Sequence, residues 1–114
     1  MSILSELNSL LLKLEIAVET GKFSGAVPNE YVVITPLSDT FEVHADNRPH
    51  FEVQEVRLSL FCKSNYQTRK NQIVKELLSA DFTVTDRRYI GHEDDSGYYH
   101  YAVDIAKEYE FEEE

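Results

Sequence analysis

The segment FEVQEVRLSLFC, residues 51–62, decides the fold class, because it is the longest strand candidate in a chain of 114 residues. Apolar residues occupy every second position of its second half: Val56, Leu58, Leu60 and Cys62. A period of two residues is typical of a strand with one buried face. Phe51 and Val53 have the opposite parity, which predicts a β-bulge near residues 54–55 that bends the strand.

A helix is predicted directly after this strand. The sequence SNYQ, residues 64–67, fits a capping box in which Ser64 and Gln67 satisfy each other's backbone N–H groups. The buried stripe expected for this helix consists of Ile73, Val74, Leu77 and Leu78. Strands over residues 82–90 and 99–105, joined by a turn at residues 94–97, then form a predicted antiparallel hairpin.

The N-terminal side begins with a predicted amphipathic helix from Ser2 to Glu19. Apolar residues recur there at spacings of three and four: Leu4, Leu7, Leu11, Leu14 and Val18. Thr20 and Gly21 are expected to end the helix, because glycine readily adopts the left-handed conformation of a helix C-terminus. Leu12 and Ile16 widen the apolar arc, which is a hint that one flank faces a second chain.

Two short strands are predicted between the first helix and the central strand. The β-branched run at residues 31–35 is expected to end at Pro36, and an alternating strand follows at residues 40–44. A turn at residues 45–49 then leads into the central strand, so that this region forms a hairpin arm.

These elements predict an α+β fold. We expect a mostly antiparallel sheet of about five strands with two helices packed on one face, in the order α-β-β-β-α-β-β. The length fits a single domain over residues 1–109, followed by an acidic C-terminal tail at residues 110–114. Five glutamates lie within the last seven residues: Glu108, Glu110, Glu112, Glu113 and Glu114.

Composition limits the functional classes. Hydrophobic residues make up 42% of the chain, enough for one core, and the net charge of −10 disfavours a general nucleic-acid binder, which needs a cationic surface. Cys62 is the only cysteine, so no internal disulfide is possible, in agreement with a reducing compartment. The N-terminus has neither the pattern of a signal peptide nor that of a membrane span, so we expect a protein that is cytosolic when made and has no membrane partner.

The sequence offers little for catalysis or metal binding. His44, Asp46 and His50 are a possible ligand set, but ordinary turn chemistry around Asn47 and Arg48 explains this segment better, because a zinc site needs three or four convergent ligands. The acidic residues 93–95 are interpreted as a solvated turn, since the alternating ligands of a calcium loop are missing. No nucleophile motif or glycine-rich phosphate loop is present, so we expect a protein that is not an enzyme and uses no cofactor.

Candidate contact residues are basic side chains in an acidic chain. Arg87 and Arg88 are neighbours on a strand and should point to opposite faces, so one of them is a candidate to reach a carboxylate of a neighbouring chain. The simpler alternative is that both pair with solvent or with nearby Asp and Glu. Together with Asp46, Asn47 and Arg48 in the turn, they are the expected subunit or partner contacts.

A set of short motifs resembles the small tail-completion or tail-terminator proteins of long-tailed phages and prophages. The motifs extend over roughly residues 1–109 and are YVV at 31–33, Phe41 with ADN at 45–47, the alternation at 56–60, the leucine pair at 77–78, Tyr89-Ile90, and a closing tyrosine-rich strand that ends near Glu108. The chain departs from this pattern in a longer final turn, residues 91–97, and in its acidic tail.

The resemblance implies a structural virion protein that acts as a ring, usually a hexamer. Such a ring caps the finished tail tube and forms the junction with the head connector, first in the host cytoplasm and then in the tail or neck of the virion. DNA would pass through the lumen without specific binding. Six copies at −10 would sum to about −60, and an acidic channel repels the DNA backbone.

Other classes remain open at this point. A head-side joining or minor capsid protein is close to the first hypothesis, and the sequence separates the two poorly. An acidic DNA mimic that inhibits a DNA-binding enzyme fits the size and charge, although much of the acidity lies in the terminal tail. A small enzyme is the least favoured class.

Overall fold

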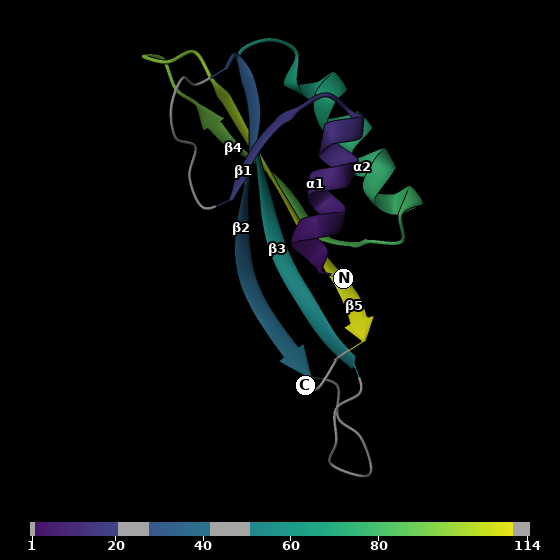
Figure 1. Cartoon of the computed structure of the whole chain (residues 1–114). Helices are drawn as coiled ribbons and strands as arrows, with labels where there is room; N and C mark the ends of the chain where they lie inside the picture. Colours follow the sequence, from purple (N-terminus) through teal and green to yellow (C-terminus); the bar gives the residue numbers. More distant parts are fainter. Residues whose placement is uncertain (1, 21–27, 42–50, 111–114) are drawn as a thin grey trace.

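The computed structural model describes residues 2–20, 28–41 and 51–110 of the chain. Their elements, in order, are α1 (Ile3–Lys13), β1 (Ala17–Thr20), β2 (Glu30–Phe41), β3 (Phe51–Cys62), α2 (Tyr66–Ser79), β4 (Thr83–His92) and β5 (Tyr99–Glu110). The strands form one sheet in the order β1-β2-β3-β5-β4, and both helices lie on the same side of it (Figure 1). The expected α+β class is confirmed, but the sheet is mixed because β1 runs parallel to β2.

The central strand β3 organises the core. Leu58 and Leu60 are each only 2% exposed, and their register partners on β2 and β5 bring apolar side chains to the same face. The helices cover this face with Leu7, Leu11 and Leu77, which have no exposed surface. Burial of such side chains is the main favourable term in folding, at about 1.5–3 kcal/mol each.

The first helix is shorter than the sequence pattern predicts. It begins after Ser2, whose hydroxyl accepts a hydrogen bond from the Ser5 N–H, but it ends at Lys13 instead of continuing to Glu19. Glu15 adopts a left-handed conformation with φ of 59°, and the N–H of Ile16 donates to the Leu11 carbonyl. This Schellman closure turns the chain back onto the sheet, so the residues expected in the last helical turn form strand β1.

The second helix ends in the same way. Asp81 has φ of 67°, and the N–H of Phe82 donates to the Leu77 carbonyl at 3.0 Å. In both helices the flanking apolar pair of the motif is buried, Leu11 with Ile16 and Leu77 with Phe82. A hydrophobic contact across the closure is common in this motif and fixes where the next strand begins.

Strand β2 passes through Pro36, which was expected to end it. The first predicted short strand and the start of the second, residues 40–41, are therefore parts of one strand, Glu30–Phe41, whereas residues 42–44 and the predicted turn at residues 45–49 lie outside the described residues. Pro36 is tolerated because pairing with β1 ends at Ile34, so that β2 is an edge strand at this point, and because a register shift lies between Pro36 and Ser38. The prediction of a bulge within β3 is wrong: the extra residue is Leu37 of β2, whereas β3 pairs with β5 without interruption.

The start of α2 lies one residue later than the capping box predicts. Asn65 is the N-cap, and its side chain accepts from the Thr68 N–H. Asparagine is as good an N-cap as serine, so the Ser64 hydroxyl is left to contact the Cys62 sulfur at 3.5 Å. Of the predicted buried stripe, Ile73 and Leu77 are buried and Val74 is half-buried, but Leu78 is exposed.

The C-terminal hairpin is confirmed. β4 and β5 are antiparallel, with Tyr89 opposite Tyr101, and Gly97 takes a positive φ of 82° in the turn between them. Glu110, expected in the acidic tail, is the last residue of β5 and lies opposite Phe51. Residues 111–114 lie outside the described part of the chain.

Candidate functional site

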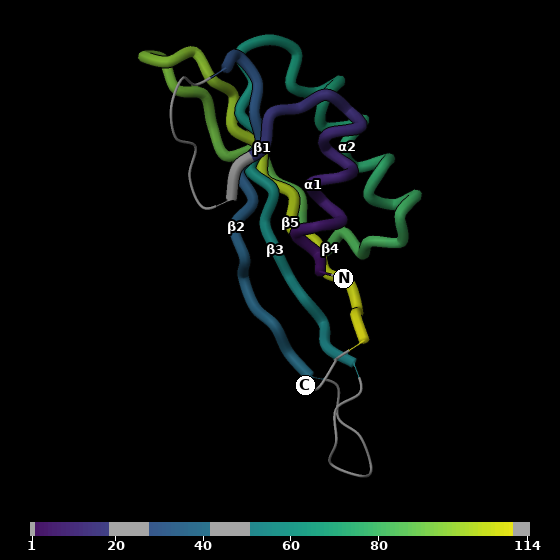
Figure 2. Tube along the Cα trace, viewed as in Figure 1, coloured from purple at the N-terminus to yellow at the C-terminus, as the bar shows by residue number. Residues whose placement is uncertain are grey.

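Strands β2, β3 and β5 continue past their outer neighbours and form a three-stranded extension, here called the arm. It consists of residues 35–41 of β2, 51–55 of β3 and 107–110 of β5. Pairing with β1 ends at Ile34 and pairing with β4 ends at Ala106, so within the described ranges no strand lies on either side of the arm. Figure 2 shows these strands running beyond the helices. Open strand edges of this kind are templates for another chain.

The arm is acidic and partly apolar. Its carboxylates are Asp39, Glu52, Glu55, Glu108 and Glu110, and its one basic residue is Lys107. Three large apolar side chains of the arm are exposed: Leu37 at 46%, Phe41 at 54% and Phe51 at 38%. Apolar side chains beside an open backbone edge are features that natural monomers usually avoid.

The opposite edge of the sheet is β4, and its pairing is interrupted twice. Register shifts against β5 lie between Val84 and Asp86 and between Tyr89 and Gly91, which leaves residues 86–89 as the longest regular run. Bulges blunt an edge strand and limit its pairing to short segments. Tyr89 and Ile90 are each 49% exposed, so this short segment is bordered by apolar surface.

The two candidate arginines lie on this edge strand. Arg87 pairs in register with Val103 of the core and Arg88 with Ala102, so they point to opposite faces, as the sequence predicted. The Arg88 Nε donates to the Asp86 carboxylate at 2.8 Å, which matches the simpler interpretation for this residue. Arg87 is exposed and has no ion-pair partner among the residues that the structure describes.

The other three candidate contact residues, Asp46, Asn47 and Arg48, lie outside the described residues, as do His44 and His50 of the possible metal site. Within the described ranges, no group of three His, Cys, Asp or Glu is placed to hold a metal ion. The acidic turn after β4 is solvated as expected, since the Asp94 side chain is 98% exposed and its one contact is with His92 at 3.3 Å.

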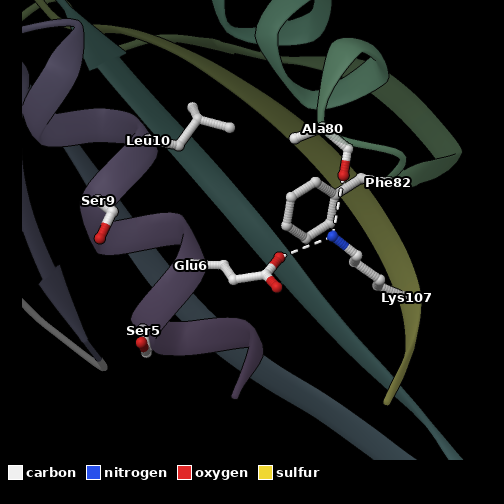
Figure 3. A pocket seen from close by; sticks show the side chains of 7 residues that line it. All are labelled: Ser5, Glu6, Ser9, Leu10, Ala80, Phe82 and Lys107. Atoms are coloured by element: carbon white, nitrogen blue, oxygen red, sulfur yellow. Dashed lines mark hydrogen bonds and ion pairs between the residues drawn. The ribbon is translucent and has the colours of Figure 1, made fainter. Parts of the chain in front are cut away.

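A cleft of about 390 Å³ lies between α1, the end of α2 and β5 (Figure 3). The Lys107 ammonium crosses it to the Glu6 carboxylate at 2.8 Å and also donates to the Ala80 carbonyl at 2.9 Å. The same ammonium lies 4.5 Å from the centre of the Phe82 ring. The Lys107 ammonium is thus engaged by a carboxylate, a carbonyl and an aromatic ring. We interpret these contacts as structural, because they hold α1 to the sheet.

An aromatic ladder crosses the sheet face that the helices do not cover. The rings of Tyr31 and Phe61 stack at 4.8 Å between centroids, and Phe61 stacks on His100 at 4.2 Å. Tyr98 packs edge-on against Phe61, and its hydroxyl donates to the Pro28 carbonyl. The Nε2 atom of His100 is buried without a hydrogen-bond partner in the part of the chain that the structure describes.

The ladder predicts a pH dependence of stability. Burial lowers the pKa of His100 below 6.5, with nearby Glu93 acting in the opposite direction and Arg57 adding to the decrease. The unfolded chain therefore binds this proton at a higher pH than the folded chain, so stability is full above about pH 6.5 and falls as the pH decreases. His100→Gln should flatten the slope of the unfolding free energy between about pH 7 and pH 5. His92→Gln, on an exposed histidine, is the control, and equal slopes for wild type and His100→Gln would contradict the prediction.

Comparison of the sequence with models of known protein families and with curated proteins found no match. No helix in the described ranges has the length and apolar character needed to cross a membrane. Sequence reasoning pointed to Arg87 and Arg88 but missed the arm, whose one signal was the continuation of strand character on both sides of Pro36.

Proposed function

We propose that the protein is a structural subunit of a phage or prophage tail, of the tail-terminator kind. Copies assemble into a ring, most simply a hexamer, that caps the tail tube and forms the junction with the head connector. The ring assembles in the host cytoplasm and stays in the neck of the virion, and DNA passes through its lumen. In this proposal the subunit catalyses no reaction and requires no cofactor.

The arm is the observation that supports this proposal best. A protein that acts alone gains nothing from a sheet extension with two open edges and exposed Leu37, Phe41 and Phe51. In an assembly the same groups become contacts, because backbone edges find partner strands and apolar side chains leave water.

Charge supports the same proposal. The chain carries −10, and a ring of six would surround its lumen with about −60. DNA binds proteins through phosphate contacts with cations, so an acidic lumen allows it to slide.

Light scattering across a concentration series tests the assembly. We expect a particle of six times the 13.2 kDa subunit mass, or a mass that rises toward this value with concentration. Binding to purified tail tubes is the second measurement, because a ring can also form only on the tube. A chain that stays monomeric and does not bind tail tubes would contradict the proposal.

The same mass and binding experiments distinguish two alternative functions. Copurification with capsids instead of tails would indicate a head-side joining or minor capsid protein. The carboxylates of the arm also suit an acidic DNA mimic, which would be monomeric and would bind a DNA-binding enzyme in a salt-sensitive manner.

A further inference from the structure

We infer that the arm of one copy docks on strand β4 of the next copy, in a head-to-tail contact that repeats around the assembly. This inference deepens the proposed function, on which it rests, by naming the two surfaces that meet. The occupant of the arm is therefore a second copy of this chain.

Charge complementarity within the chain favours this contact. The arm has five carboxylates, and its single cation, Lys107, is used within the subunit by Glu6. β4 presents Arg87, which is exposed and has no ion-pair partner within the described ranges, next to Arg88. Opposite charges across an interface fix its register and select the partner.

Each of the two open edges contains a regular run of four residues. On β2 the pairing is regular over residues 38–41, after the bulge at Leu37. On β4 it is regular over residues 86–89, between its two register shifts. These two runs can therefore pair side by side, with Asp39 of one copy near Arg87 or Arg88 of the next.

Apolar side chains border both segments. Leu37 and Phe41 flank the edge of β2, and Tyr89 and Ile90 flank the edge of β4, all of them between 46% and 54% exposed. Aromatic and arginine side chains are enriched at the energetic centres of protein interfaces. The two surfaces thus complement each other in charge, edge length and apolar character.

Arm-to-arm pairing is the main alternative for a second copy, and charge disfavours it. It would bring Asp39 of one copy close to acidic residues of the other arm, and like charges on neighbouring strands are destabilising. A contact between two different surfaces is heterologous, and such contacts repeat into closed rings or open filaments.

Two variants that each lose one surface test the contact. Ile90→Asp places a carboxylate on β4 facing the acidic arm, and Leu37→Lys places a cation on the arm facing the arginines. Both side chains are about half exposed, so both variants should fold, which circular dichroism checks. Each alone should weaken self-association at least about tenfold, as measured by sedimentation velocity.

Mixing the two variants gives the decisive result. Each variant keeps one surface intact, and the two altered surfaces carry opposite charges, so a head-to-tail contact predicts that the mixture assembles with the two variants in equal numbers, whereas neither variant alone assembles to this extent. A charge exchange tests the contact between Asp39 and Arg87. Arg87→Glu should weaken assembly, and Asp39→Lys in the same chain should restore it. Leu12→Lys, on an exposed leucine of α1, which belongs to neither surface, is the control and should leave the assembly unchanged.

The outcomes separate this inference from the proposed function. If wild type forms rings and neither variant disturbs them, the arm–β4 contact is wrong and the ring function stands. If mixing restores assembly but wild type forms only open filaments, the contact stands and the ring function fails. A wild-type chain that remains monomeric at every concentration overturns the contact, and binding to tail tubes then decides the function separately.

Discussion

Leu58→Asp is expected to lower the free energy of unfolding by about 3 kcal/mol or more. Leu58 lies on the central strand, is 2% exposed, and belongs to the core cluster between the helices and the sheet. A carboxylate at this position loses its hydration without gaining a partner, and the apolar burial of the leucine is lost as well. Urea denaturation followed by circular dichroism measures the change.

Thr35→Asp is the matched control for this prediction. Thr35 lies in the neighbouring strand, is exposed, and pairs in register with Arg57, so a new carboxylate there remains hydrated beside a cation. The free energy of unfolding should change by less than about 0.5 kcal/mol. Soluble Leu58→Asp protein with an unchanged transition would show that Leu58 does not face the core.

Leu11→Ala is expected to destabilise the protein by about 2–5 kcal/mol, since it leaves a cavity where a fully buried side chain was. Leu11 also accepts, through its carbonyl, the hydrogen bond from Ile16 that closes α1. Its side chain packs with Ile16 in the same core, so the variant weakens both the core and the transition into β1.

The neighbouring residue supplies the comparison. Leu12 is 75% exposed, so Leu12→Ala should change the free energy of unfolding by no more than about 0.5 kcal/mol. Thermal and urea denaturation of the pair give the difference. Equal losses at the two positions would mean that the orientation of α1 differs from the one described.

The sequence predicted the class, the central strand, the second helix and the closing hairpin, because each has a strong period and a clear boundary. It failed at the end of α1, because residues 2–19 keep a helical apolar spacing past the point where the helix ends. The boundary depends on the left-handed Glu15, and this conformation is usually expected of glycine. The available signal was a six-residue pattern that occurs twice, at residues 11–16 and 77–82. In both places two leucines are followed by two other residues, and then by an acidic residue and an apolar residue.

The error in β2 has a different physical cause. Proline ends a central strand, but at an edge its missing N–H leaves no partner unsatisfied, and only the strand pairing shows that β1 ends before Pro36 and leaves β2 at the edge there. β3 is regular, so Phe51 and Val53 point to the face opposite that of Val56, and the bulge in this part of the sheet lies across the ladder at Leu37 of β2. A single strand's pattern does not tell which member of a pair carries the bulge.

The candidate surfaces were the least predictable feature. Arg87 and Arg88 were identified as an unusual basic pair in an acidic chain, which is visible in composition. The arm was not identified from the sequence, because it exists only where three strands extend past their neighbours. Where a strand ends depends on pairing between distant parts of the chain.

The carboxylates of the arm have a consequence for the newly made subunit before any assembly. A regular strand edge flanked by Leu37 and Phe41 is the kind of segment that nucleates stacked β-aggregates during synthesis and storage. Asp39 places negative charge on that segment, and Glu52 and Glu55 add to it from the adjacent strand, so the arms of free subunits repel one another. High salt would screen this repulsion, and the same arm would then become an aggregation-prone part of the described chain.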